Sequence, residues 1–279
     1  MIKEVQRTFS IGDTWLYYKI YCGTKTADDV LLQVIQPLTM YLWRENCIEQ
    51  WFFIRYADPD PHLRVRFKYA SEDHIQHIMT STRDAMNSLI KNGQLWDVQL
   101  ATYNRELERY GPNTIKLCEK LFFYDSQQVL EIMQHAVDDT SRFINCFHWV
   151  SFLISQFELH AEEQLAFLDR MQIQFKEEFD IKKEANKQLN QKYKGLESLL
   201  FKKSRRGLTK NDLMCTIIQE LLHLEEKRQL EVSKENLLAS FIHMTINRTF
   251  KSQQRLHEMM LYDFLNKMNK SKMARYGKL

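Results

Sequence analysis

Apolar and aromatic residues are grouped in two different ways along the chain, and the first 111 residues mix the two. Short runs rich in aromatic and β-branched side chains, bounded by Gly, Pro, Asn or Asp, are typical of strands. Such runs occupy four stretches: 14–22, 50–56, 63–69 and 96–103. The second and third runs are joined by a turn at residues 57–61, which contains two prolines that fix φ and exclude helix.

Two helices are predicted between these strands. The first begins at Thr26, where apolar residues start to recur at helical spacing, and a kink is expected at Pro37. The second runs from Ser71 to about Lys91 and stops at Asn92-Gly93. The order strand, helix, two strands, helix, strand is the split βαβ, ferredoxin-like pattern. It predicts an antiparallel sheet with helices on one face.

The remainder of the chain has a helical pattern almost throughout. Residues 114–204 and 209–267 carry apolar positions three and four apart, as in the stripe Leu213, Ile217, Leu221 and Leu224. The predicted class is therefore α+β, with a ferredoxin-like antiparallel sheet and its helices in residues 1–111 and a large helical part in residues 112–279. We expect the two parts to pack as one functional unit.

The amino-acid composition excludes few functions, whereas the hydrophobic pattern already predicts a fold class. The 279 residues are 44% hydrophobic with seven Gly and four Pro, which suits a large and mainly helical core. A net charge of +3 gives no indication of bulk nucleic-acid binding, so any positive patch must be local. The N-terminus lacks the apolar run of a signal peptide, and no stretch predicts a membrane span, so we expect a cytoplasmic protein.

Few segments suggest a metal, a cofactor or a polyanion. The five cysteines are scattered and never form a CxxC pair, which favours reduced thiols over structural zinc. The basic run Lys202–Gly207 is predicted to be a loop between helices; either it is ordinary exposed turn chemistry or it contacts an acidic peptide or RNA. Motifs for phosphate loops, dinucleotides, serine hydrolases and zinc proteases are absent, so we expect no cofactor.

The segment 51–67 is the most unusual in the chain because two arginines are spaced for one side of a strand. Arg64 and Arg66 are two residues apart, so both point to the same face, while Leu63, Val65 and Phe67 point to the other. If the apolar set faces the helices, the two guanidiniums share the open face, where an anion would relieve their repulsion. Arginine is suited to carboxylate capture. The alternative is a pair of surface arginines with local acidic partners.

Two further segments carry candidate chemistry. Residues 103–111 contain Arg105 and Arg109, four apart with glutamates interleaved, which on its own also fits an ordinary charged element with local ion pairs. A late helix contains His243 among apolar neighbours, as structural histidines often are. Asn247 is four residues further on the same helical face, where it could orient the imidazole ring.

Taken together, these segments resemble the C-terminal SpaB-type region of class I lantibiotic dehydratases, a region that also occurs as free-standing thiopeptide-type bacteriocin biosynthesis proteins. The resemblance covers essentially the whole chain, and the motifs that carry it occur in the same order as in the family. They are the strand at Trp15, residues 51–56, Asp58-Pro59, residues 62–67, residues 103–111, Leu121-Phe122 with Asp125-Ser126, and His243-Met244 with Asn247-Arg248.

The resemblance implies a stand-alone elimination enzyme of a split dehydratase. In the family, one region esterifies Ser and Thr of a precursor peptide with glutamate from charged tRNA, and the C-terminal region expels the glutamate to leave dehydroalanine or dehydrobutyrine. The partners implied are a precursor peptide and a separate glutamylating protein; a homodimer stays open. The family's elimination residues fall on Arg64, Arg66, Arg105 and His243. Four neighbouring residues in the same motifs are expected to bind substrate: His62, Tyr103, Arg109 and Asn247.

The proposed roles follow from the chemistry of β-elimination. Arg64 and Arg66 would hold the glutamyl ester, which keeps a free carboxylate, and Arg105 would lie near the charge that develops on the peptide carbonyl. His243 would transfer a proton, since imidazole can take up and return one near neutral pH. Two alternatives stay open: a pyridine-forming cycloaddition enzyme of a thiopeptide pathway, and a non-catalytic protein that captures a leader segment on a sheet edge.

Overall fold

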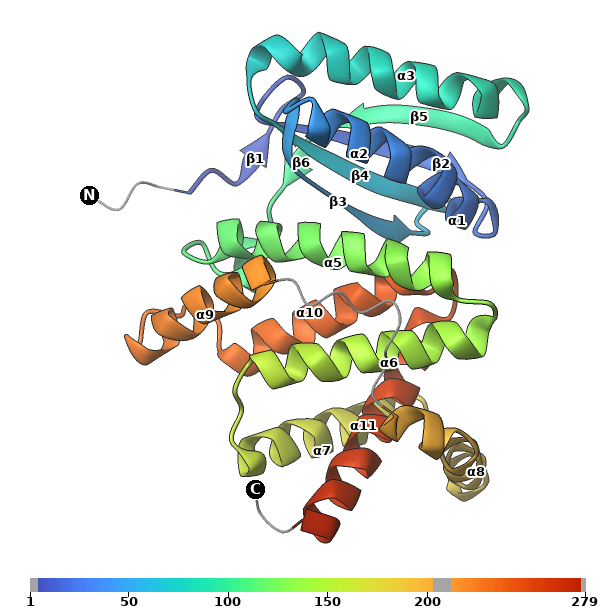
Figure 1. Cartoon of the computed structure of the whole chain (residues 1–279), viewed down its shortest axis with the longest axis vertical. Coiled ribbons are helices and arrows are strands. Elements are labelled where there is room, and N and C mark those ends of the chain that lie inside the picture. The colour runs from blue at the N-terminus through green and yellow to red at the C-terminus, as the bar shows by residue number, and fades with distance from the viewer. Residues whose placement is uncertain (1–4, 203–211, 277–279) are drawn as a thin grey trace.

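The structure, a computed structural model that describes residues 5–202 and 212–276, confirms the α+β class (Figure 1). Four strands form an antiparallel sheet in the order β3-β4-β2-β5. Their bounds are β2 Trp15–Cys22, β3 Ile48–Tyr56, β4 His62–Tyr69 and β5 Leu95–Ala101. This strand order is the ferredoxin-like one that the sequence predicts. We call residues up to 111 the sheet lobe and those from 112 the helical lobe.

The helices between the strands cover one face of the sheet. The first run consists of α1 Thr26–Val30, a π-helical turn η1 Leu31–Ile35 and α2 Gln36–Arg44. The irregular turn comes directly before Pro37, whose missing N–H and bulky ring disturb the regular helical ladder at the predicted place. A 3₁₀ turn, η2 Glu72–His74, leads into α3 Ile75–Lys91, and the following Gly93 has a φ of +69° that ends the helix as predicted.

The end of the fourth strand differs from the prediction. We expected it to reach Tyr103, but β5 ends at Ala101, and β6 Tyr103–Asn104 pairs instead with β1 Thr8–Phe9 in a separate two-stranded sheet. The ring of Tyr103 stacks on Phe9 with 5.7 Å between centroids. The chain then forms the single turn α4 Leu107–Tyr110. Tyr103 and the residues that follow are thereby placed over one end of the main sheet.

Seven longer helices make up the described part of the helical lobe. They are α5 Ile115–His135, α6 Asp139–Gln156, α7 Ala161–Glu178, α8 Lys183–Phe201, α9 Asp212–Glu226, α10 Lys234–Thr249 and α11 Gln254–Tyr276. Breaks in the predicted helical stretch coincide with residues of positive φ, Glu158 at +49° and Asp180 at +46°. Of the basic run Lys202–Gly207, all but Lys202 lies outside the described residues.

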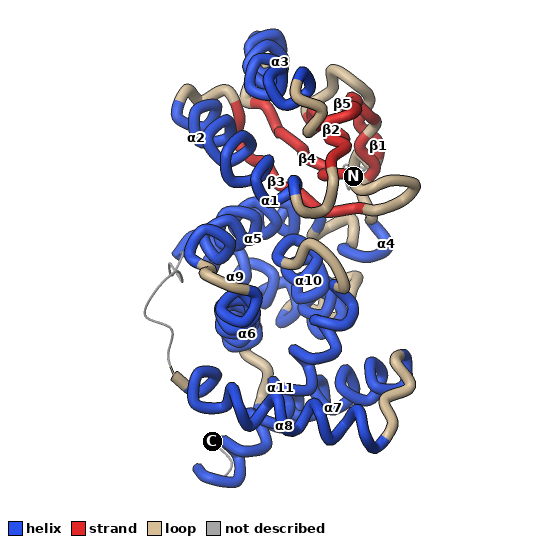
Figure 2. Tube along the Cα trace, turned by 90° about the vertical axis from the view of Figure 1, so that its right-hand side faces the viewer, coloured by secondary structure: helices blue, strands red, loops and turns tan. Residues whose placement is uncertain are grey.

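Helix α5 joins the two lobes. It lies between the sheet and the other helices, with α6 and α10 beneath it and α7, α8 and α11 at the far end (Figures 1 and 2). Its Phe123 belongs to the core between the sheet and α1–α3, whereas the neighbouring Phe122 belongs to the core of the helical lobe. A helix that contributes to both cores couples the lobes through apolar burial.

A buried polar layer, which we call the seam, fixes α10 and α5 to the edge strand β3. Asp125 of α5 accepts hydrogen bonds from Trp149 Nε1, Thr245 Oγ1 and Arg248 Nη1 at 2.7–2.8 Å. Arg248 Nε donates to the carbonyl of Phe53, and the Phe53 amide donates to Ser126 Oγ. Side chains thus satisfy backbone groups that the edge strand would otherwise leave unpaired.

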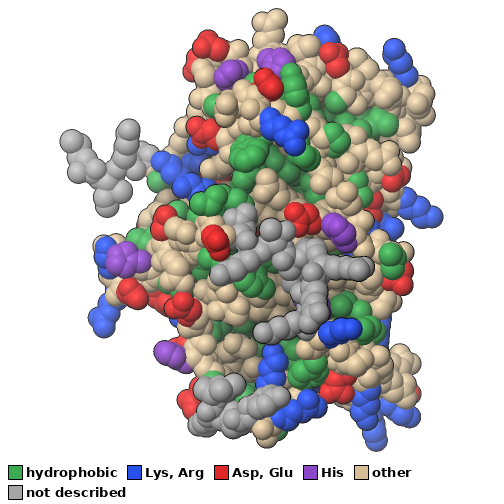
Figure 3. Space-filling view, viewed as in Figure 1, with side chains coloured by type: hydrophobic (Ala, Val, Ile, Leu, Met, Phe, Trp, Pro, Cys, Tyr) green, Lys and Arg blue, Asp and Glu red, His purple; other side chains and the backbone are tan. Residues whose placement is uncertain are grey.

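Charged side chains of both signs are present on the face of the molecule that Figure 3 shows. On the face shown in Figure 3, basic and acidic side chains are intermixed, as expected from the small net charge. In the described ranges we find no helix that is long and apolar enough to cross a membrane. All five cysteines are unpaired; four are buried and Cys215 is partly exposed.

Candidate functional site

Arg66 stands in an aromatic cage that the sheet register builds. The apolar residues Leu63, Val65 and Phe67 are fully buried against the helix-covered face, which confirms the predicted orientation of β4 and places Arg66 on the other face. Its cross-strand neighbours are Tyr17 on β2 and Phe52 on β3. The Cζ atom lies 4.3 Å, 5.1 Å and 4.8 Å from the ring centroids of Tyr17, Phe52 and Tyr103, respectively.

The guanidinium of Arg66 is buried and forms no ion pair with any residue that the structure describes. The residue is only 7% exposed, and its Nε and Nη1 have no hydrogen-bond partner within the described ranges. Burial lowers the pKa of Arg66 because water no longer solvates its charge. The hydroxyl of Tyr17 beside it is also buried and has no hydrogen-bond partner among the described residues, and burial raises its pKa, so it remains a donor. Two adjacent unsatisfied donors are costly unless a ligand completes them.

Arg105, in contrast, is fully engaged in an ion pair. Its Nε and Nη2 form two hydrogen bonds to the carboxylate of Glu119 at 2.7 Å and 2.6 Å, and its Nη1 donates to the carbonyl of Gln6. Burial acts against the charge of Arg105, but the Glu119 carboxylate outweighs it and raises the pKa of the guanidinium. Tyr103 Oη also donates to Glu119, at 2.9 Å. Arg105 and Glu119 therefore hold one wall of the cage.

Arg64 and His62 bond to each other further along the same face. Arg64 Nε donates to His62 Nε2 at 3.0 Å, and the guanidinium lies 3.4 Å from the ring centroid of Tyr56. His62 Nδ1 contacts the carbonyl of Asp60 at 2.7 Å, and its ring packs on Tyr21. Burial lowers the pKa of His62, which keeps the ring neutral and able to accept from Arg64. Arg64 is half-buried and thus reachable from the cage side of the sheet.

His243 and Arg109 share a shallow hollow of about 230 Å³ on the helical lobe. His243 Nδ1 lies 2.9 Å from Oε2 of Glu258, a carboxylate that is 2% exposed and is also bound by Arg255. Arg109 Nε donates to Ser240 Oγ, and its Nη1 lies 3.5 Å from Glu106. The charge of Glu106 also acts on Arg66, so this glutamate links the hollow electrostatically with the cage.

The predicted role of Asn247 in orienting His243 was wrong. Both atoms of the Asn247 amide bond the backbone of Arg55 at 2.9 Å, so this side chain belongs to the seam. Glu258 instead occupies the orienting position beside the imidazole. The helical spacing placed Asn247 on the correct face of α10, but the edge of β3 offered a free donor and acceptor that the amide matches.

Sequence reasoning missed three residues of the site: Tyr17, Glu119 and Glu258. Tyr17 was accessible in principle, because pairing the predicted strand 14–22 with 63–69 brings it opposite Arg66 on the same face. The two glutamates lie on helices whose contacts with Arg105 and His243 depend on tertiary packing. The structure thus brings Arg66, Tyr103 and Arg105 together, groups His243 with Arg109, and pairs Arg64 with His62.

A family model described as "Lantibiotic biosynthesis dehydratase C-term" matches residues 15–268 of this chain. The chain belongs to this family. It is 30% identical to the subtilin biosynthesis protein SpaB of Bacillus subtilis over 176 residues, which cover 62% of this chain and 17% of SpaB. It is 23% identical to the nisin biosynthesis protein NisB of Lactococcus lactis subsp. lactis, covering 86% of this chain and 26% of NisB. The family member therefore spans only a fraction of these relatives' length.

The fold is also found in solved structures, of which two are compared with this chain. The tRNA-dependent lantibiotic dehydratase MibB from Microbispora sp. 107891 aligns with a TM-score of 0.68 at 18% identity, over 96% of this chain and 29% of MibB. The pyridine synthase TbtD from thiomuracin biosynthesis aligns with a TM-score of 0.63 at 10% identity, over 93% of this chain and 100% of TbtD. Family and relatives support a role in the biosynthesis of lantibiotic-type modified peptides.

Proposed function

We propose that this lantibiotic dehydratase family member is a lyase that eliminates glutamate from glutamylated Ser and Thr residues of a precursor peptide. The observation that carries the proposal is Arg66, a buried guanidinium inside the cage that has no counter-ion among the described residues. Burying a cation without a counter-ion lowers the stability of the fold by several kcal/mol, and an anionic ligand would offset that loss when it binds. The glutamyl ester supplies such an anion.

In the proposed reaction a base removes the Cα proton of the esterified residue. The electron pair forms the Cα–Cβ double bond, the Cβ–O bond breaks, and glutamate leaves as a carboxylate, so that dehydroalanine or dehydrobutyrine remains. Negative charge develops on the peptide carbonyl and then on the leaving carboxylate. Arg66 with the Tyr17 hydroxyl, assisted by Arg64, can donate to either oxyanion in a place sheltered from water.

The proton-transfer group in this proposal is His243. When its Nδ1–H donates to the buried Glu258, its Nε2 carries the lone pair that accepts a proton. Arg109 lines the same hollow and would bind the peptide or its glutamyl group. Because Arg105 already donates hydrogen bonds to Glu119 and Gln6, we assign it a positioning role. It holds Glu119 and, through that carboxylate, Tyr103.

The proposal also implies partners. A separate glutamylating protein, using glutamyl-tRNA, would supply the esterified precursor peptide, and we place both steps in the cytoplasm, where charged tRNA is made. The exposed edge of β5 and the hollow beside His243 are surfaces on which an extended peptide can lie. The mass of the purified protein in solution would show whether it forms a homodimer.

The test is incubation of the purified chain with a glutamylated precursor, followed by mass spectrometry of the peptide. Wild type should release glutamate, whereas Arg66→Ala and His243→Ala should leave the glutamylated peptide to accumulate. An Arg83→Ala variant, which removes an exposed arginine of α3, is the matched control and should react like wild type. Normal dehydration by Arg66→Ala or by His243→Ala would refute the assignment of that residue.

A second candidate function is pyridine-forming cycloaddition on an already dehydrated peptide. It is considered because the chain shares its fold with the pyridine synthase TbtD as well as with MibB. Such an enzyme has no glutamyl carboxylate to bind, so an unpaired Arg66 would have no evident ligand. In the same assay, cyclisation of a dehydrated peptide with loss of its leader would support this candidate, and no change in either peptide would leave a non-catalytic binding protein.

A further inference from the structure

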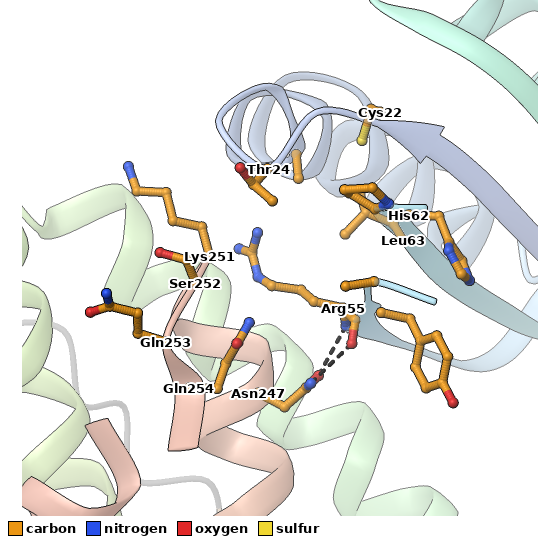
Figure 4. A pocket seen from close by; sticks show the side chains of 14 residues that line it. Cys22, Thr24, Arg55, His62, Leu63, Asn247, Lys251, Ser252, Gln253 and Gln254 are labelled. Atoms are coloured by element: carbon orange, nitrogen blue, oxygen red, sulfur yellow. Dashed lines mark hydrogen bonds between the residues drawn. The ribbon is translucent and has the colours of Figure 1, made fainter. Parts of the chain in front are cut away.

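A second cavity lies at the end of the sheet, where Arg55 enters it from the face opposite to the aromatic cage and where Tyr56 and His62 also line it. It has a volume of about 420 Å³ and opens between the end of β2, the β3–β4 hairpin and the segment that leads into α11 (Figure 4). Cys22, Thr24 and Ala27 line it from one lobe, and Lys251 to Gln254 line it from the other. His62 and Asn247, two of the residues expected to bind substrate, also line it, but the proposed elimination assigns no role to Arg55 or Lys251.

Arg55 reaches into this cavity from β3. It lies on the same side of the strand as the core residue Phe53, opposite to Phe52 of the cage. Its Nε donates to the carbonyl of Arg248 at 2.8 Å and its Nη2 to Asp28 Oδ1 at 2.7 Å. The residue is 6% exposed, yet its Nη1 is buried without a partner within the described ranges. The guanidinium end points toward the space between Thr24 and Lys251 (Figure 4).

The charges around this cavity do not balance. Asp28 is the carboxylate that neutralises Arg55, but it is shared with Arg142 at 2.8 Å. Burial opposes its ionisation, but the two guanidiniums outweigh this and hold the pKa of Asp28 below its usual range. Lys251 adds a further cation, and none of the described residues that line the cavity is acidic. Asp28 is therefore shared between two guanidiniums, and Lys251 lines the cavity as a further cation.

We propose that this cavity binds a small oxyanion, a carboxylate or phosphate group on a molecule no larger than an amino acid. Arg55 Nη1 and Lys251 Nζ would donate to the anion, and Thr24 and Ser252 also line the cavity. The anion completes the hydrogen bonding of Arg55 and balances the excess positive charge. This site is distinct from the cage, because the side chains of Arg55 and Arg66 point to opposite faces of the sheet.

Isothermal titration of the full chain with glutamate and, separately, with inorganic phosphate tests the proposal. At least one of the two should bind to wild type, and the arm that binds identifies the source of the anion. Lys251→Ala should weaken that binding roughly tenfold, as loss of one charge-assisted contact does. The matched control is Lys25→Ala, which removes an exposed lysine next to the cavity that does not line it and should leave the affinity unchanged.

Three outcomes would overturn the proposal: absence of binding in both arms, equal weakening by Lys251→Ala and Lys25→Ala, or binding that Arg66→Ala removes and Lys251→Ala does not. The last outcome would assign the anion to the cage alone. Arg55→Gln is a second variant, but it also disturbs the seam, so its binding is interpreted only with a thermal unfolding profile like that of wild type. Because neither Lys251 nor Thr24 belongs to the elimination site, failure of this proposal leaves the proposed function untouched.

Discussion

The cage around Arg66 and the seam around Asp125 are both buried and both contain an arginine, but the two guanidiniums have different contact partners. In the seam, Arg248 pairs with Asp125 at 2.8 Å and donates to the carbonyl of Phe53. In the cage, Arg66 meets three aromatic rings and no carboxylate, and two of its nitrogens have no partner in the described part of the chain. The charge of Arg248 is balanced by a carboxylate of the protein, although its Nη2 has no hydrogen-bond partner among the described residues. Among the same residues Arg66 has no such carboxylate, and in the proposed function a ligand supplies it.

This difference separates residues that hold the fold from residues that await a substrate. Three of the motifs that carry the family resemblance lie together in the seam: residues 51–56, Asp125-Ser126 and Asn247-Arg248. Such motifs identify the fold family without marking the chemistry. A paired buried charge contributes to positioning, whereas an unpaired one costs stability that only a function explains.

The largest expected effect is in the seam. Arg248→Met should lower the free energy of unfolding by about 3–5 kcal/mol, because it leaves the Asp125 carboxylate buried without its ion-pair partner. Urea unfolding followed by circular dichroism measures the change. A loss below about 1 kcal/mol would mean that the seam is not a structural network and would remove the contrast drawn above.

The same substitution in the cage should act on activity instead. Arg66→Met should lower the rate of glutamate release about a hundredfold or more, the usual loss when one oxyanion donor is removed. Its unfolding free energy should stay equal to that of wild type or rise, since the variant no longer buries an unpaired cation. Destabilisation comparable to that of Arg248→Met would show that Arg66 serves the fold.

A smaller loss is expected where the seam meets the backbone of β3. Asn247→Ala removes both hydrogen bonds to Arg55 and leaves that amide and carbonyl unpaired, which should cost about 1–3 kcal/mol in thermal or urea unfolding. Asn87→Ala on the exposed side of α3 is the control and should change stability by less than about 0.5 kcal/mol. Equal effects of the two variants would contradict the assignment of Asn247 to the seam.

The smallest effect is on pH dependence. Burial lowers the pKa of His62 below its ordinary 6.5, so the unfolded chain binds a proton at a higher pH than the folded protein does. The stability tied to His62 is therefore present above pH 6.5 and is lost as the pH falls below it. Urea unfolding between pH 7.5 and pH 5 should show a shallower decline for His62→Phe than for wild type. The surface variant His77→Gln should keep the wild-type slope; identical slopes for all three proteins would refute this linkage.

Local pattern was sufficient for most of the sheet lobe. Strand runs, the turn with Pro59, the stop at Asn92-Gly93 and the common face of Arg64 and Arg66 depend on neighbours in the sequence, and each is found as predicted. The end of the fourth strand was wrong by two residues because Tyr103 is drawn to Phe9 and Glu119, which lie far away in the chain. The orienting partner of His243 was wrong for the same reason.

The sequence by itself determined the α+β class, the strand order and the family, because alternation, helical spacing and motif order are properties of neighbouring residues. Only the tertiary structure decided which arginine is free. Arg66 and Arg105 both stand in family words, but whether a guanidinium meets a carboxylate depends on which helix packs beside it. Glu119 of α5 reaches Arg105, whereas the guanidinium of Arg66 contacts the rings of Tyr17, Phe52 and Tyr103.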